Sequence, residues 1–171
     1  MGEQFAIQVG GVTLLLDRAD AASAAAQLAQ AGFLAEVAPV DGPLIIGDDH
    51  PLWSMHSGGK RHEGQEWEPG DVDLAQTQDQ LPPLTSIFHR TLVDHPGQLL
   101  SVPELARLTE GRLSSPRVIA GALSGYGKWC DQMNRRFPFE WWENSEGGPS
   151  TYAMRHRVAA VFRHARTLRG S

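Results

Sequence analysis

The sequence predicts an α+β protein in which a small N-terminal ββαββ unit precedes a mainly helical C-terminal domain. Alternating apolar and polar residues near the N-terminus predict the strands of the first unit. Beyond residue 81, apolar residues recur at helical spacing between strong helix-start and helix-stop signals. A polar stretch without periodicity lies between the two, so the predicted segments are 1–47, 48–81 and 82–171.

The N-terminal unit begins with a predicted hairpin. Residues 5–9 and 12–16 alternate apolar and polar side chains around the Gly10-Gly11 pair, a pattern typical of a two-residue hairpin turn. An alanine-rich helix is predicted next, ending at Gly32. Two further short strands are predicted, at 33–40 and 43–46. Because alanine buries little apolar area, we expect this unit to depend for its stability on the second domain or on another copy of itself.

Residues 48–81 are predicted to form an acidic polar connector. The segment is rich in glycine, histidine, glutamine and acidic residues and has no apolar period. Trp53 and Trp67 are unusual in a free linker, so we expect parts of the segment to pack on a neighbouring surface.

Charge is distributed unevenly along the chain. The net charge is −5, but residues 1–81 hold 3 Lys and Arg against 13 Asp and Glu, whereas residues 82–171 hold 12 against 7. A basic half points to an anionic partner, of which nucleic acid is the commonest. The alternative is that the acidic half docks on the basic half within the same molecule.

The helices of the C-terminal domain carry boundary signals. Residues 84–92 place apolar side chains at i, i+3, i+4, i+7 and i+8, which predicts the first helix. Ser101 and Glu104 have the spacing of a capping box for the second helix. The third helix has Pro116 at its first position, after two serines that can cap it. A β-hairpin and an amphipathic helix are predicted to follow, at 137–154 and 155–170.

This order of helix, short strand, capped helix, long helix, hairpin and helix resembles the winged helix-turn-helix domain over about residues 83–168, half of the chain. The stretches SVPELARLTEG and SSPRVIAGALSGYGKWCDQMNRR are also similar to those of small actinobacterial proteins of unassigned function. The resemblance implies that the third helix lies in the major groove of DNA, with its first residues at the base edges. Winged helices also serve as protein-binding modules, so the fold alone does not assign a function.

The third helix has one apolar face and one short, polar, mostly basic face. Arg117 suits a guanine edge, Ser124 suits a base or a phosphate, and the cations further along suit phosphates. With Arg112 from the preceding turn, the candidate DNA-binding residues are Arg112, Arg117, Gly121, Ser124, Lys128 and Arg135. The alternative is an ordinary solvated face, since charged stripes are usual on amphipathic helices.

Three glycines lie within this helix, and each costs about 0.5–1 kcal/mol relative to alanine. Gly121 falls on the polar face, where it would let a DNA backbone approach closely. Gly125 and Gly127 lie nearer the packed side, where they would allow tight helix packing or a bend.

The predicted hairpin argues partly against DNA contact by the wing. Its tip carries Glu143 and Glu146, which would repel a phosphate chain. Trp141 and Trp142 alternate across the strand, so one is expected to be buried and the other exposed or covered. Trp142 is therefore a candidate protein-interface residue, because tryptophan is a common interface anchor.

Other function classes lack support in the sequence. No phosphate-binding loop, dinucleotide fingerprint or nucleophile elbow is present, so no catalytic residue or cofactor is predicted. His50, His56 and His62 lack the close pairing typical of zinc sites, so no metal is predicted. Cys130, the single cysteine, rules out an internal disulfide and is consistent with a cytoplasmic protein. No apolar run approaches 18 residues and no signal peptide is apparent, so no membrane contact is predicted.

The favoured hypothesis is a non-catalytic protein that binds double-stranded DNA as a transcriptional regulator, acting as a homodimer because two recognition helices are the usual route to useful affinity. The alternative is a protein-interaction adaptor that uses the winged helix and the acidic N-terminal half.

Overall fold

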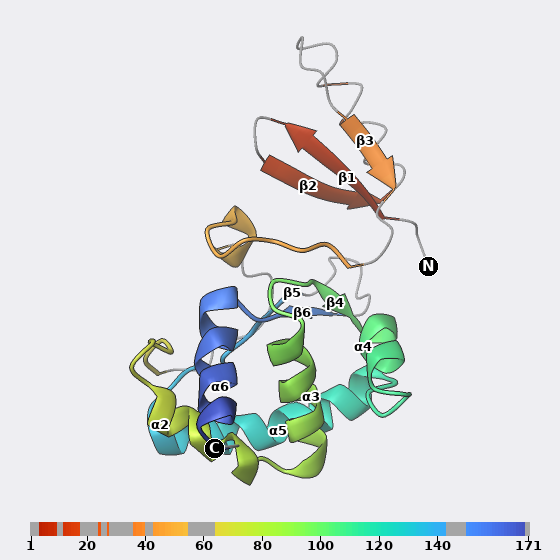
Figure 1. Ribbon diagram of the computed structural model, residues 1–171. Helices are drawn as coiled ribbons and strands as arrows, with labels where there is room; N and C mark the ends of the chain where they lie inside the picture. Colours follow the sequence, from red (N-terminus) through yellow and green to blue (C-terminus); the bar gives the residue numbers. More distant parts are fainter. Residues whose placement is uncertain are drawn as a thin grey trace. The chain divides into compact units, whose positions relative to one another are not determined.

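The structure is a computed structural model, and it describes residues 4–9, 12–17, 24, 27, 36–39, 43–54, 64–142 and 150–169. The chain divides into two compact units, residues 1–42 and 43–171 (Figure 1). The described residues include both α-helices and antiparallel sheets, so the protein has an α+β architecture.

The first unit contains a three-stranded antiparallel sheet in the order β2-β1-β3. Its strands are β1 (Gln4–Val9), β2 (Val12–Asp17) and β3 (Glu36–Pro39). Val9 pairs with Val12, so β1 and β2 have the register of a tight hairpin. Of the alanine-rich helix expected after β2, only residues 24 and 27 are described, both in helical conformation, and the rest lies outside the described residues.

The fourth strand expected in this unit, residues 43–46, belongs instead to the second unit. Ile45 forms an antiparallel bridge with Gln98, and the Leu99 amide donates to the Leu44 carbonyl at 2.8 Å. Gly97 makes this approach possible, because a Cβ there would lie 2.5 Å from the Ile46 carbonyl oxygen. The full ββαββ order is therefore not seen among the described residues.

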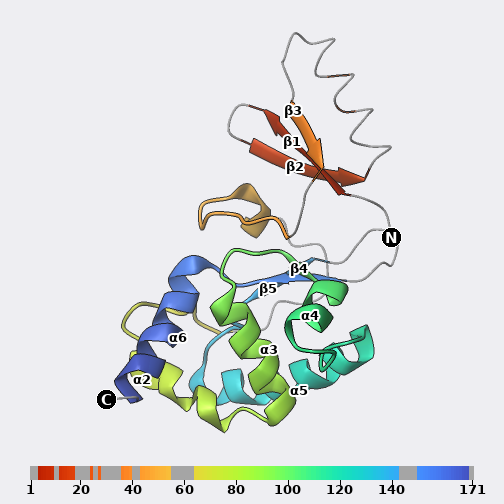
Figure 2. The same ribbon diagram turned by 45° about the vertical axis from the view of Figure 1, so that its right-hand side comes forward.

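The second unit holds the helices and a second antiparallel sheet, in the order β4-β6-β5 (Figure 2). Its elements are η1 (Pro51–Ser54), α2 (Val72–Ala75), η2 (Gln76–Gln80), α3 (Pro83–Asp94), β4 (Leu100–Ser101), α4 (Val102–Leu108), α5 (Pro116–Met133), β5 (Glu140–Trp142), β6 (Thr151–Ala153) and α6 (His156–Arg169). The expected hairpin tip, residues 143–149, includes Glu143 and Glu146 and lies outside the described residues.

Local signals account for the start of α4 and of α5. The Glu104 carboxylate accepts hydrogen bonds from the Ser101 amide at 2.6 Å and from the Ser101 hydroxyl at 2.7 Å. At α5, the Ser115 hydroxyl oxygen accepts a hydrogen bond from the Val118 amide, and Pro116 occupies the first turn. Asn134 ends α5 in the left-handed conformation.

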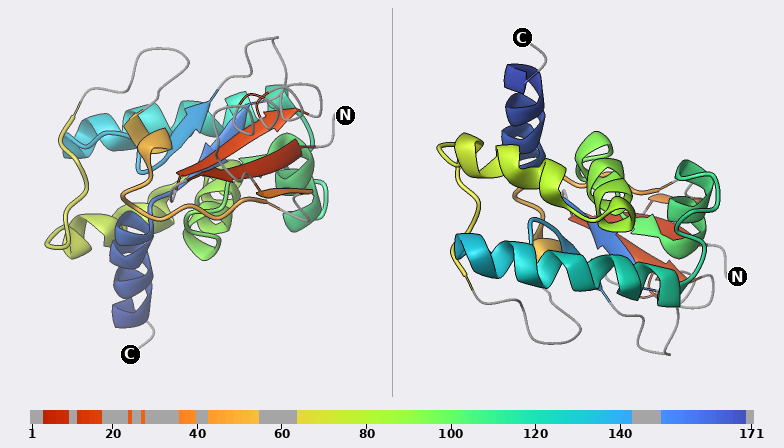
Figure 3. Two further views of the ribbon diagram at one scale, coloured as in Figure 1. Left: turned by 90° about the horizontal axis from the view of Figure 1, so that it is seen from above. Right: turned by 90° about the horizontal axis from the view of Figure 1, so that it is seen from below.

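The ribbons of α3, α5, α6 and the sheet lie close together in the second unit (Figure 3). Their aromatic side chains form the core. Phe88 of α3 makes edge contacts with Tyr126 of α5 and with Tyr152 of β6, at centroid distances of 6.1 and 5.4 Å. The buried residues of α5 are those of the apolar face that helical spacing indicates: Ile119, Ala122, Tyr126, Trp129 and Cys130.

Residues 64–81, expected to be part of a polar connector, pack on this core. Trp67 is buried and stacks on Trp129 at 5.4 Å, and its indole N–H donates to the Arg136 carbonyl at 2.9 Å. Ala75 and Leu81 are buried in the same core. The few apolar residues of this polar segment thus hold it against the body of the second unit.

The three glycines of α5 have different surroundings. A Cβ at Gly125 would lie 2.4 Å from the Thr85 hydroxyl oxygen, so α3 and α5 could not pack as closely with a larger residue there. A Cβ at Gly121 or Gly127 would meet nothing within 4 Å. Helix packing therefore explains only Gly125.

Candidate nucleic-acid interface

The outward face of α5 brings together four of the six candidate DNA-binding residues. Arg117, Gly121, Ser124 and Lys128 lie on one side of α5 and are all exposed. At 1.5 Å per residue, Arg117 and Lys128 are about 16 Å apart along the helix axis. Between them the helix surface carries only short side chains, so a partner can approach the backbone of α5 closely.

Ser124 is partly engaged with its own helix. Its hydroxyl donates to the Gly121 carbonyl at 2.7 Å, a common arrangement for serine within helices. The hydroxyl oxygen keeps its capacity to accept a hydrogen bond.

The turn between α4 and α5 adds further cations at the N-terminal end of this face. Arg112 is exposed in the turn, which is held by a hydrogen bond from the Leu113 amide to the Thr109 hydroxyl at 3.1 Å. Arg107 of α4 is also exposed. Among the described residues, none of the four cations Arg107, Arg112, Arg117 and Lys128 takes part in an ion pair. Sequence reasoning missed Arg107, although its place in the last turn of a helix leading to the turn was a usable signal.

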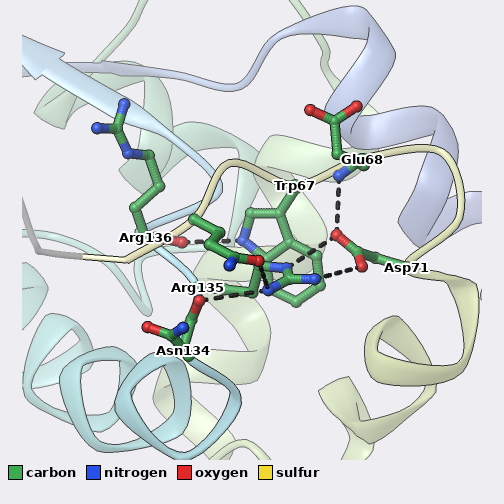
Figure 4. A network of polar contacts seen from close by, with 7 residues as sticks. Trp67, Glu68, Asp71, Asn134, Arg135 and Arg136 are labelled. Atoms are coloured by element: carbon green, nitrogen blue, oxygen red, sulfur yellow. Dashed lines mark hydrogen bonds and ion pairs between the residues drawn. The ribbon is translucent and has the colours of Figure 1, made fainter.

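Arg135 does not belong to the exposed face, and this corrects the sequence prediction. Its guanidinium makes a two-fold contact with the Asp71 carboxylate, at 2.9 Å from Nε and 2.6 Å from Nη2, and a third bond to Gln65 (Figure 4). The side chains of Arg135 and Asp71 are 14% and 11% exposed. The hydrogen bond from Arg135 lowers the pKa of Asp71, and the same bond raises the pKa of Arg135. A guanidinium held in this way is not available to a phosphate.

The arginines of α6 that lie near its C-terminus are also occupied. Arg166 pairs with Asp94 of α3 at 2.6 Å, and Arg169 pairs with Asp79 of η2. Arg163 donates from Nε to the Val93 carbonyl at 3.0 Å. Within the described residues, Arg135, Arg136, Arg166 and Arg169 take part in ion pairs. The four cations around α4 and α5 do not, and neither do the exposed Arg90 of α3 and Arg157 of α6.

Trp142 is covered by a segment that precedes it by about ninety residues. Its indole N–H donates to the Leu52 carbonyl at 3.2 Å, and its ring lies 5.6 Å from that of buried Trp53. The guanidinium of Arg155 lies over the Trp53 ring at 5.0 Å. Trp142 is half-buried, so the structure gives it an internal packing role, and its part in a protein interface stays a prediction.

Asp48, in the same segment, caps α6. Its two carboxylate oxygens accept hydrogen bonds from the His156 and Arg157 amides at 2.6 and 2.8 Å. No local sequence pattern could have identified this cap, because 108 residues separate Asp48 from His156.

A buried hydrogen bond and a buried thiol lie behind the exposed face of α5. The Thr85 hydroxyl donates to the Ala122 carbonyl at 2.7 Å. The thiol of Cys130 is buried, and burial raises its pKa to about 12, so it is protonated and a poor nucleophile at neutral pH.

Two other sequence predictions concern metals and membranes. Of the three connector histidines, only His50 lies within the described residues, and those residues contain no cluster of three or more potential metal ligands. No helix in the described part of the chain combines the length and apolar character that crossing a bilayer requires.

Comparisons with curated proteins and with solved structures gave no match. Residues 75–169, more than half of the chain, match the model of a family of unknown function (DUF6416). The matched region runs from the end of α2 to the end of α6 and so contains the whole exposed face of α5. The chain therefore belongs to this family of unknown function.

Proposed function

We propose that the second unit is a winged helix-turn-helix domain that binds double-stranded DNA through the exposed face of α5, without catalysis, as a transcriptional regulator. The observation that carries this proposal is the group of cations around α4 and α5, which make no ion pair within the described residues although other arginines of the same unit are paired.

The order of the elements supports the proposal. The short strand β4 lies between α3 and α4, and it joins β5 and β6, which follow the long helix α5, in a sheet of order β4-β6-β5. In a helix-turn-helix of this kind, α4 would cross the DNA backbone and α5 would enter the major groove.

The shape of the α5 face also supports DNA as the partner. The major groove is about 12 Å wide and admits a single α-helix. Short side chains at Gly121 and Ser124 keep the middle of α5 narrow, and Arg117 in its first turn would reach a base edge. Arg112 and Lys128 lie on either side of that position in the sequence and would contact phosphates.

A homodimer follows from the number of available cations. Each phosphate contact adds about 0.9 to the salt dependence of binding, and a single face of three or four cations supplies only weak attraction. Two copies binding two half-sites would double this number.

The test measures binding of the full chain to a mixed-sequence DNA duplex. Fluorescence anisotropy gives the affinity at salt concentrations from about 50 to 200 mM. Lys128→Ala should weaken binding and reduce the salt slope by about one unit, because Lys128 would contact a phosphate. Arg117→Ala should weaken binding with a smaller change in slope, because Arg117 would contact a base edge. Arg157→Ala is the matched control, because Arg157 is an equally exposed arginine on α6. The proposal would be overturned if the unaltered chain did not bind at about 50 mM salt. It would also be overturned if Arg157→Ala lost as much DNA affinity as the two α5 variants.

A further inference from the structure

The exposed face of α5 ends at a clamp formed by residues 64–71 (Figure 4). The Gln65 amide donates to the Asn134 carbonyl at 3.1 Å, and the Arg136 amide donates to the Gln65 carbonyl at 3.0 Å. Gly64 allows this backbone pairing, because a Cβ there would lie 2.5 Å from the carbonyl carbon of Arg135. The clamp is thus built into the end of α5 through the main chain.

The clamp holds two arginines that follow α5. Asp71 binds Arg135 through both carboxylate oxygens, and Glu66 binds the Nη1 atom of Arg136 at 2.5 Å. The Arg136 side chain is 27% exposed and that of Glu66 is 49% exposed, so this second pair is accessible to solvent. Loss of Glu66 would leave the Arg136 guanidinium without its carboxylate partner.

The position of the clamp matters for any polyanion on α5. Arg135 lies seven residues after Lys128 and two residues beyond Met133, where α5 ends, because Asn134 in the left-handed conformation takes the chain out of the helix. Beyond the end of α5, the clamp holds three carboxylates: those of Asp71 and Glu66 are paired with Arg135 and Arg136, and Glu68 is exposed. A phosphate chain that continued beyond Lys128 and the end of α5 would therefore meet the Glu68 carboxylate and two arginines that are already held in ion pairs.

We propose that the clamp sets the C-terminal limit of the DNA contact on α5, by withholding Arg135 and Arg136 from phosphates and confining a bound duplex to the turns between Arg117 and Lys128. This inference rests on the proposed DNA-binding function. In this proposal, residues 64–71 form an autoinhibitory contact that keeps the duplex at the N-terminal turns of α5.

The test compares two variants of the full chain that each release one surface arginine. Glu66→Gln releases Arg136, which follows the end of α5 by three residues, whereas Asp94→Asn releases Arg166 on α6. The two ion pairs are well matched, with side-chain exposures of 27% and 49% for the first and 30% and 50% for the second. Both variants remove one negative charge, so a general charge effect would appear in both.

Glu66→Gln should bind the duplex more tightly than the unaltered chain at about 50 mM salt, with a salt slope steeper by about 0.9. Its advantage should therefore shrink roughly threefold between 50 and 200 mM salt. Asp94→Asn should keep the slope of the unaltered chain.

Equal behaviour of the two variants, or an unchanged slope in Glu66→Gln, would overturn the role of the clamp while leaving DNA binding in place. Failure of the unaltered chain to bind DNA at all would instead overturn the proposed function and, with it, this inference. Melting temperatures of both variants should stay close to that of the unaltered chain, because both altered side chains lie at the surface.

Discussion

The Nδ1 atom of His89 on α3 lies 2.5 Å from the hydroxyl oxygen of Tyr126 on α5, and both side chains are fully buried. His89 Nε2 lies 3.2 Å from the Gln78 side-chain oxygen, which can only accept a hydrogen bond. This arrangement assigns the ring proton to Nε2 and makes Nδ1 the acceptor for the Tyr126 hydroxyl. A neutral histidine therefore joins η2 and α3 to the middle of α5.

The charge state of His89 should make folding stability depend on pH. Burial lowers the pKa of His89 from its ordinary value of 6.5 to about 3. Between these values the unfolded chain binds the proton and the folded chain does not, so the free energy of unfolding should fall as pH decreases from about 6.5 towards 3. The loss should approach about 1.4 kcal/mol per pH unit in the lower part of that window.

Urea denaturation at pH 7.5, 5.5 and 4.5 measures this effect. The control is His89→Gln, which keeps an acceptor for Tyr126 but cannot titrate. The variant should be less stable at pH 7.5 and should lose less stability on acidification. Parallel pH profiles for the two proteins would show that other groups cause the pH dependence.

Alanine substitutions at the three glycines of α5 should change the free energy of unfolding in opposite directions. Gly125→Ala should lower the free energy of unfolding by about 1–3 kcal/mol, because its Cβ would press on Thr85 across the α3 contact. Gly121→Ala and Gly127→Ala should each raise it by about 0.5–1 kcal/mol, because both positions have open space. Chemical denaturation of the three variants provides the comparison.

DNA binding by the same variants separates Gly121 from Gly127. If a duplex approaches the face centred on Gly121, Gly121→Ala should stabilise the fold and yet weaken binding several-fold, whereas Gly127→Ala should only stabilise the fold. Unchanged affinity in Gly121→Ala would argue against close approach at this position.

The contribution of the Asp48 cap on α6 to stability should be measurable, although Asp48 lies 108 residues before His156. Asp48→Ala should lower the free energy of unfolding by about 0.5–2 kcal/mol, because two amides at the helix start lose their acceptor. Asp49→Ala is the control, since Asp49 is the exposed neighbour and its side chain makes no hydrogen bond within the described residues. Thermal unfolding followed by circular dichroism should show a lower midpoint only for the first variant.

The folding unit should extend beyond the region that defines the family. A chain that begins at residue 75 lacks Trp67, Asp48 and Trp53, all of which contact the body of the second unit. Loss of a buried tryptophan alone costs about 3–5 kcal/mol. The fragment 75–171 should therefore melt well below the fragment 43–171, and equal melting temperatures would show that the preceding segments add little.

Much of α4 and α5 was predictable because their determinants are local. The capping residues, Pro116 and the apolar spacing act within a few residues of one another, so the sequence alone indicates where each helix begins and which face is buried. Arg117 and Lys128 were placed correctly on the outward face of α5 for the same reason.

Other features were not predictable, because they depend on residues far apart in the chain. Arg135 is unavailable to a partner because it binds Asp71, which lies 64 residues away. Trp142 is covered by a segment that lies 90 residues earlier in the chain. The polar composition of residues 64–81 indicated a connector. Trp67 indicated that part of it packs on a neighbouring surface, and only the structure shows that this surface is the core of the second unit.

The sequence by itself determined the helices of the second unit, their buried faces and the cations that α5 turns outward, since helical period and capping are properties of neighbouring residues. Only the tertiary structure decided which of the basic residues stay unpaired and which glycine of α5 is required for packing. Those outcomes are set by what each side chain meets across the fold, and a carboxylate 64 residues away neutralises an arginine as completely as one in the next turn.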